Sequence, residues 1–180
     1  MRRSELEHAI RAATEIIKQD AVFIIGSQSI LGSFSEDELP EEATMSEEVD
    51  IAPMHDDDAE SLATELDAVI GELSQFHETH GFYVQGVGKD TAVLPSGWTD
   101  RLVKLSNDNT KGRTGLCLEP HDLCVAKLIA GRPKDHLFVG AVLKHGMVSA
   151  EVICDRLQTV ENDNLRRDRA LSWVQSSFFS

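Results

Sequence analysis

Two acidic residues are the part of this sequence whose types and spacing most clearly suggest chemistry. Glu48 and Asp50 alternate with the apolar Val49 and Ile51. This pattern is typical of a strand, in which residues two apart project from one face, roughly 7 Å apart at Cα. Two carboxylates held side by side can bind a divalent cation such as Mg²⁺, because hard oxygen ligands suit that ion. The pattern also fits a surface strand with a solvated acidic face, and the spacing alone leaves both interpretations open.

A glycine-serine pair, Gly26 and Ser27, adds a second chemical feature. It follows an apolar run at residues 22–25, which indicates a buried strand that enters a tight turn and then a short helix near residues 29–31. Backbone N–H groups in such a turn can bind phosphate oxygens. We expect the strands at residues 22–25 and 48–52 to be neighbours, with the turn and the acids at one sheet end. The sequence therefore predicts a place where a metal ion and a phosphate could meet.

Helices and strands are mixed along the first two thirds of the chain, and helices alone follow. Ser4 and Glu7 form the pattern of a capping box before a first helix, and residues 33–46 suggest a long acidic loop. The other elements are predicted as a helix from the acidic run 56–58 to about residue 70, strands at residues 82–85, 92–94, 101–105 and 116–118, and helices at residues 120–130, 134–145, 149–159 and 163–176.

This order predicts an α/β fold, a small mixed sheet flanked by helices. We expect a core at residues 1–118 and a helical C-terminal part at residues 119–180 that packs on it.

The formal net charge of −14 is unevenly distributed along the chain. No Lys or Arg lies between Lys18 and Lys89, and that interval holds 17 of the 31 acidic residues. The acidic part is therefore not expected to bind nucleic acid non-specifically, because phosphates need basic groups for neutralisation. If a phosphorylated substrate binds near the acids, a metal ion must offset the carboxylates, and further cations must come from the C-terminal half of the chain. The arginines at residues 166–169 there are interpreted as solvated charge.

Composition also limits the cellular setting. No apolar run approaches the length of a membrane span, and the start of the sequence lacks the apolar core of a secretory leader. The three cysteines have no C-x-x-C spacing, so neither a disulfide framework nor a zinc site is indicated. We expect a cytoplasmic protein without a membrane partner.

The order of the motifs resembles the polymerase-beta-like nucleotidyltransferase superfamily. Its signature, h-G-[GS] followed by h-[DE]-h-D-h, fits the turn at residues 26–27 and the strand at residues 48–52. Two later segments, HDLxxxK at residues 121–127 and RPKD at residues 132–135, are similar to the C-terminal signature of its minimal bacterial members. These include toxin nucleotidyltransferases of abortive-infection type and uncharacterised relatives. The resemblance extends along most of the chain and implies a nucleotidyltransferase-like core.

The resemblance implies roles for particular residues. The Gly26–Ser27 turn would face the phosphates, and Glu48 and Asp50 would bind Mg²⁺, with Mn²⁺ as an alternative. Further phosphate contacts would come from Lys127, Arg132 and Lys134. From the sequence, Lys127 fits an ordinary exposed helix lysine equally well, and Asp135 fits either a charge that pairs with a neighbouring cation or a catalytic group.

Many members have a third carboxylate that deprotonates the acceptor hydroxyl, and the candidates for it here are Asp100, Glu119 and Asp122. Glu119 is favoured as the catalytic residue because it ends a strand. The implied function is Mg²⁺-dependent transfer of a nucleotidyl group from an NTP to a hydroxyl of RNA, a protein or a small molecule. An alternative is a catalytically inactive nucleotidyltransferase-like module that binds a protein partner, for example in a toxin–antitoxin or defence pair. A metal phosphohydrolase using the same acids is a further alternative.

Overall fold

The fold is built on a five-stranded mixed sheet, seen in a computed structural model that describes residues 1–55 and 58–178. The strand order is β3-β2-β1-β5-β4. The β1–β5 and β2–β3 pairs are parallel, whereas β1–β2 and β4–β5 are antiparallel. The predicted α/β class is confirmed, and the strands are β1 (Ala21–Ile24), β2 (Glu48–Pro53), β3 (Tyr83–Gly86), β4 (Val103–Leu105) and β5 (Thr114–Cys117).

The central pairing of the sheet agrees with the expectation from the sequence. In β1 and β2, Phe23 lies opposite Ala52, and the Ile25 N–H donates to the Asp50 carbonyl oxygen at 3.0 Å. The chain leaves β1 into a short 3₁₀ helix, η1 (Ser27–Gly32). The two strands predicted to be neighbours therefore are neighbours, and the turn after β1 lies beside Asp50.

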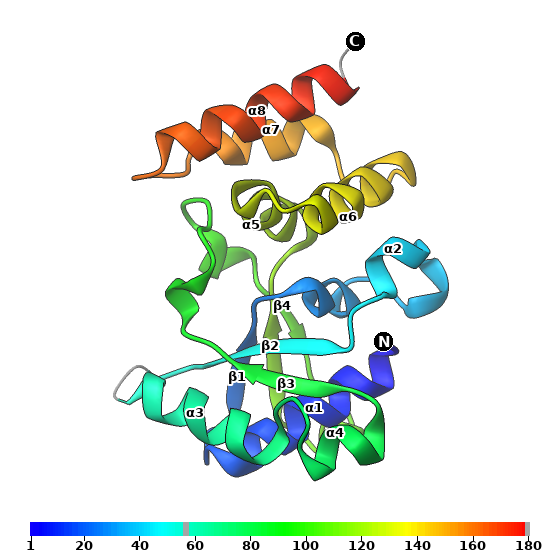
Figure 1. Cartoon of the computed structure of the whole chain (residues 1–180), viewed down its shortest axis with the longest axis vertical. Helices are drawn as coiled ribbons and strands as arrows, with labels where there is room; N and C mark the ends of the chain where they lie inside the picture. The colour runs from blue at the N-terminus through cyan, green and yellow to red at the C-terminus, as the bar shows by residue number, and fades with distance from the viewer. Residues whose placement is uncertain (56–57, 179–180) are drawn as a thin grey trace.

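The helices gather in two groups (Figure 1). One group, α1, α3 and α4, lies at the sheet, and the other, α5 to α8, forms a stack at the opposite end of the molecule. No helix in the described ranges 1–55 and 58–178 is long and apolar enough to cross a membrane. The longer helices are α1 (Arg3–Ile16), α3 (Ala59–Ile70), α4 (Gln75–His80), α5 (Pro120–Ala130), α6 (Pro133–Lys144), α7 (Ala150–Gln158) and α8 (Asn164–Phe178).

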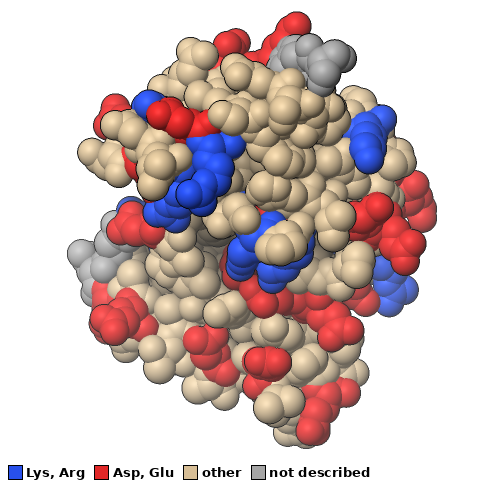
Figure 2. Space-filling view, turned by 45° about the horizontal axis from the view of Figure 1, so that its top comes forward, with Lys and Arg blue, Asp and Glu red and all other residues tan. Residues whose placement is uncertain are grey.

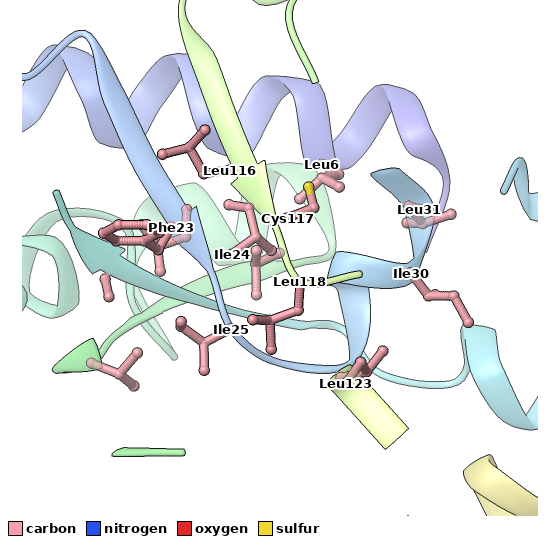
Figure 3. Close-up of a cluster of buried hydrophobic side chains, with 14 of the residues drawn as sticks. Leu6, Phe23, Ile24, Ile25, Ile30, Leu31, Leu116, Cys117, Leu118 and Leu123 are labelled. Atoms are coloured by element: carbon pink, nitrogen blue, oxygen red, sulfur yellow. The ribbon is translucent and has the colours of Figure 1, made fainter. Parts of the chain in front are cut away.

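The core joins the sheet to helices of both groups. Figure 3 shows members of one buried hydrophobic cluster, which come from β1 (Ile24), β5 (Leu116), α1 (Leu6), η1 (Ile30) and α5 (Leu123). The side chains of residues 22–25 are all buried, because β1 lies in the middle of the sheet and is covered on both faces. This explains why its sequence is a continuous apolar run instead of an alternating one.

Several local predictions were wrong for identifiable reasons. Residues 33–46 contain two short helices, η2 (Glu36–Glu38) and α2 (Glu41–Thr44). The first is stabilised by a capping box in which the Ser35 N–H and hydroxyl donate to Glu38. Residues 92–94 form no strand. They follow η3 (Lys89–Thr91) and are partly buried against the core. Their side chains are apolar because they pack on the core, and the segment pairs with no strand among the described residues.

The start of the first helix also differs from the prediction. The helix begins at Arg3, and Glu5, not Glu7, reaches back to the Arg2 N–H. Glu7 is buried and accepts hydrogen bonds from the side-chain amides of Asn107 and Asn109 at 2.7 and 2.8 Å. It therefore ties α1 to the loop before β5. The acidic residues 56 and 57, expected to start a helix, lie outside the described residues.

Candidate active site

A pocket of about 440 Å³ opens where the end of β1 and the acidic face of β2 meet the C-terminal helices. Figure 2 shows that basic side chains gather over the middle and upper part of one face of the molecule, with acidic ones mostly below them. The pocket lies between the acidic strand β2 and the helices that carry the basic side chains. Its charged lining residues are Glu48, Asp50, Lys127, Arg132, Lys134 and Arg166.

The turn after β1 comes into direct contact with the acids. Gly26 and Ser27 both line the pocket. A Cβ atom built on Gly26 would overlap the carboxylate of Asp50, so no other residue fits there without moving the acid. Glycine at this position therefore allows the backbone and the carboxylate to share one wall of the pocket.

Glu48 and Asp50 project from the same face of β2. Both are partly buried, whereas Val49 and Ile51 between and beyond them are fully buried on the other face. Burial and the neighbouring charge of Glu48 raise the pKa of the Asp50 carboxyl to about 7, although Lys127 and Arg132 act in the opposite direction. Two carboxylates crowded in this way repel each other when both are ionised. The acids are therefore not a freely solvated strand face.

Lys127 enters the pocket from α5 and is only 8% exposed. Its ammonium lies 3.2 Å from Asp135 Oδ1 and 4.5 Å from the centre of the Phe138 ring. Burial lowers the pKa of Lys127, and the Asp135 charge counteracts this. The interpretation of Lys127 as an ordinary exposed helix lysine is therefore wrong.

Asp135 holds two of the pocket cations together. The Arg132 Nε donates to Asp135 Oδ2 at 2.7 Å, and Lys127 donates to Oδ1. Burial would raise the pKa of Asp135, but the hydrogen bond from Arg132 and the charge of Lys127 lower it below its ordinary value. Asp135 thus pairs with a neighbouring cation, which was one of its two interpretations, and Lys127 is a second partner that the sequence did not indicate.

Arg166 is a pocket residue that sequence reasoning missed. It lies in the first turn of α8, forms an ion pair with Asp163 and lines the pocket together with Lys134. The sequence shows only a cluster of arginines near the C-terminus. Because α8 reaches the pocket through tertiary packing, no local signal identifies which of those arginines faces it.

Glu119 lies apart from these groups. It caps the N-terminus of α5, where its carboxylate accepts the His121 N–H at 3.1 Å and contacts the His121 ring and Arg156. Although burial opposes the shift, the hydrogen bonds from His121 and Arg156 lower the pKa of Glu119 to about 2. Such a carboxylate is a poor proton acceptor, because its conjugate acid is strong.

The other candidates for a third carboxylate are not brought to the pocket either. Asp122 is fully buried and pairs with Arg101 at 2.9 Å and Arg156 at 3.0 Å, and Asp100 lies in the 3₁₀ helix η4 (Trp98–Arg101). Among the described residues, the carboxylates that line the pocket are Glu48 and Asp50, and no group of three or more His, Cys, Asp or Glu is arranged to hold a metal.

The sequence of this chain was compared with the models of known protein families. Residues 4–175 match the model of a family described as "Nucleotidyltransferase of unknown function (DUF6036)". The chain belongs to this family. No curated protein and no solved structure matches the chain. The match to DUF6036 includes the turn after β1, both acids of β2 and the cations of α5, α6 and α8. It supports a nucleotidyltransferase-like protein in general and does not extend to toxin-type relatives.

Proposed function

We propose that this protein is a Mg²⁺-dependent nucleotidyltransferase, which transfers a nucleotidyl group from an NTP to a hydroxyl acceptor. One observation carries the proposal. Glu48 and Asp50 share a pocket wall with the Gly26–Ser27 turn, and the cations from α5 and α6 line the same pocket. This combination would let a metal ion and a phosphate group bind next to each other in one pocket.

The donor set fits a hard divalent cation. Asp50 holds its proton up to about pH 7 because of burial and the charge of Glu48, and a bound cation would remove that repulsion. Carboxylate oxygens are the ligands that Mg²⁺ and Mn²⁺ prefer. The metal, when bound, would supply positive charge that polarises the phosphoryl oxygens. We infer that Glu48 and Asp50 hold it.

The remaining residues would bind and orient the nucleotide. Lys127 and Arg132 are held by Asp135, so they need little reorganisation to meet the phosphates, and preorganised charge is the main source of catalysis in phosphoryl transfer. The Gly26–Ser27 turn would present backbone N–H groups to phosphate oxygens. The pocket volume lies within the usual range for small-molecule sites.

A second candidate function is nucleotide binding without transfer. It is favoured by the position of Glu119, whose carboxylate is committed to Arg156 and His121. In that case the acceptor hydroxyl would lack the base for which Glu119 was the favoured candidate. Such a protein would act through a partner whose binding depends on the nucleotide.

One experiment separates the two functions. The purified chain is incubated with each α-³²P-labelled NTP, with Mg²⁺ or EDTA, and with total RNA, lysate proteins or small hydroxyl compounds as acceptors. Transfer by the wild type with Mg²⁺, and its loss in Asp50→Asn, would support the transferase. Asp108→Asn, which changes an exposed acid, is the matched control and should retain activity.

Calorimetry with the same NTPs completes the test. Nucleotide binding that depends on Mg²⁺ and Asp50, without transfer to any acceptor, would favour the binding module. If no NTP binds, or if binding is identical in wild type and Asp50→Asn, both functions are refuted.

A further inference from the structure

Tyr83 lies directly beside the proposed metal ligand Glu48. The two residues are opposite each other in the parallel pairing of β2 with β3, so their side chains share one sheet face. The Tyr83 hydroxyl donates to Glu48 Oε2 at 3.1 Å. This hydrogen bond uses Oε2 of the Glu48 carboxylate, and Tyr83 makes no hydrogen bond to the other oxygen, Oε1.

We propose that Tyr83 is a positioning residue, which fixes the Glu48 side chain in the orientation needed for metal binding. The inference rests on the proposed function, because it takes Glu48 as a metal ligand. A glutamate has one more rotatable bond than an aspartate, so holding it in one rotamer has a larger entropic cost. A hydrogen bond from a rigid aromatic side chain offsets that cost before the metal binds.

The tyrosine is itself held in place by α4. The His77 ring contacts the Tyr83 ring, with centroids 4.8 Å apart. His77 Nδ1 accepts the Leu73 N–H at 3.1 Å, and its Nε2 lies 3.9 Å from a carboxylate oxygen of Glu47. The His77 ring is thus held by a hydrogen bond at Nδ1, and its packing against the Tyr83 ring restricts the movement of the tyrosine.

The test measures the affinity for Mn²⁺, which serves as the probe, by calorimetry at constant pH and salt. Tyr83→Phe removes the hydroxyl and keeps the ring, so we expect the Kd to rise about ten-fold, the lower end of the effect of losing such an outer partner. Thr79→Val, which removes a hydroxyl from neighbouring α4 that donates to the Gln75 carbonyl, is the matched control. Its Kd should equal that of the wild type.

A second background separates positioning from a general effect on the fold. Glu48→Asp keeps the charge but shortens the side chain by one methylene, so its carboxylate should no longer reach the Tyr83 hydroxyl. Tyr83→Phe should then leave the Kd of the Glu48→Asp protein unchanged. An effect of Tyr83→Phe in the wild type that is absent in Glu48→Asp shows that the two residues are coupled. An equal rise in both backgrounds would show that Tyr83 acts through the fold and would overturn the inference.

Failure of the inference can be told apart from failure of the metal site. If Glu48→Gln weakens Mn²⁺ binding and Tyr83→Phe does not, the positioning role alone is refuted. If Glu48→Gln binds Mn²⁺ as tightly as the wild type, Glu48 is not a ligand, and the metal site is refuted together with the role of Tyr83.

Discussion

Replacement of Asp50 by asparagine should make the metal-free protein more stable, and the gain should depend on pH. The folded state raises the pKa of Asp50 from 3.8 to about 7. Between these two values the folded chain binds more protons than the unfolded chain, so wild-type stability falls as the pH rises. Asparagine carries no charge at any pH, and Asp50→Asn should escape this loss.

The size of the effect follows from the shift. A difference of about 3 pKa units corresponds to roughly 4 kcal/mol, at about 1.4 kcal/mol per pH unit. The loss should begin near pH 4 and be complete a little above pH 7. For a chain of this length, 4 kcal/mol corresponds to a difference of about 10 °C in Tm. The stability curves of the two proteins should therefore diverge through this window and run parallel above it.

The assay is urea unfolding in EDTA at several pH values between 4.5 and 8. Asp108→Asn is again the matched control, because it removes an exposed acid, and its curve should follow that of the wild type. If Asp50→Asn and the wild type keep a constant difference across the range, Asp50 has no raised pKa. Repulsion between Glu48 and Asp50 would then give no reason to expect a cation between them.

Three further predictions concern the pocket and its support. Lys127→Met, which keeps the volume of the buried side chain, should weaken NTP binding roughly ten- to a hundred-fold and leave nucleoside binding unchanged in calorimetry; an equal loss for both ligands would contradict a phosphate contact. Mg²⁺ affinity should rise about ten-fold per pH unit below pH 7 and level off above it, because Asp50 must release its proton, and a flat titration series would contradict this. Asp122→Ala should lower the free energy of unfolding by about 3–5 kcal/mol, because two arginines lose a buried partner; a loss below 1 kcal/mol in urea unfolding would show that the pair contributes little.

The elements that carry strong local signals could be predicted from the sequence. The apolar run of β1 and its Gly26–Ser27 turn are encoded within a few residues, and so is the alternation of β2. The bounds of α5 follow from Pro120 at its first position and Gly131 in the left-handed conformation at its end. The capping box from Ser35 to Glu38 is also a local signal. It was missed because the many acidic residues around it favoured a loop.

The parts that depend on tertiary packing could not be predicted. Lys127 is buried because α6 brings Asp135 and Phe138 against it, and nothing near Lys127 in the sequence shows this. The role of Glu119 is decided by Arg156, which comes from α7. The contact of Tyr83 with Glu48 depends on the register between β2 and β3, which no local pattern determines.

The buried carboxylate of Asp122 has a consequence for how the molecule opens. It lies on α5 and forms ion pairs with two arginines, Arg101 at the end of η4 and Arg156 of α7. The η4 segment comes directly before strand β4. If α7 or the segment around η4 detached alone, this carboxylate would lose a partner while it stayed in a dry environment, which is a costly intermediate. The two segments should therefore separate from α5 in one concerted step, and their slowest amide protons should exchange with solvent at a common rate.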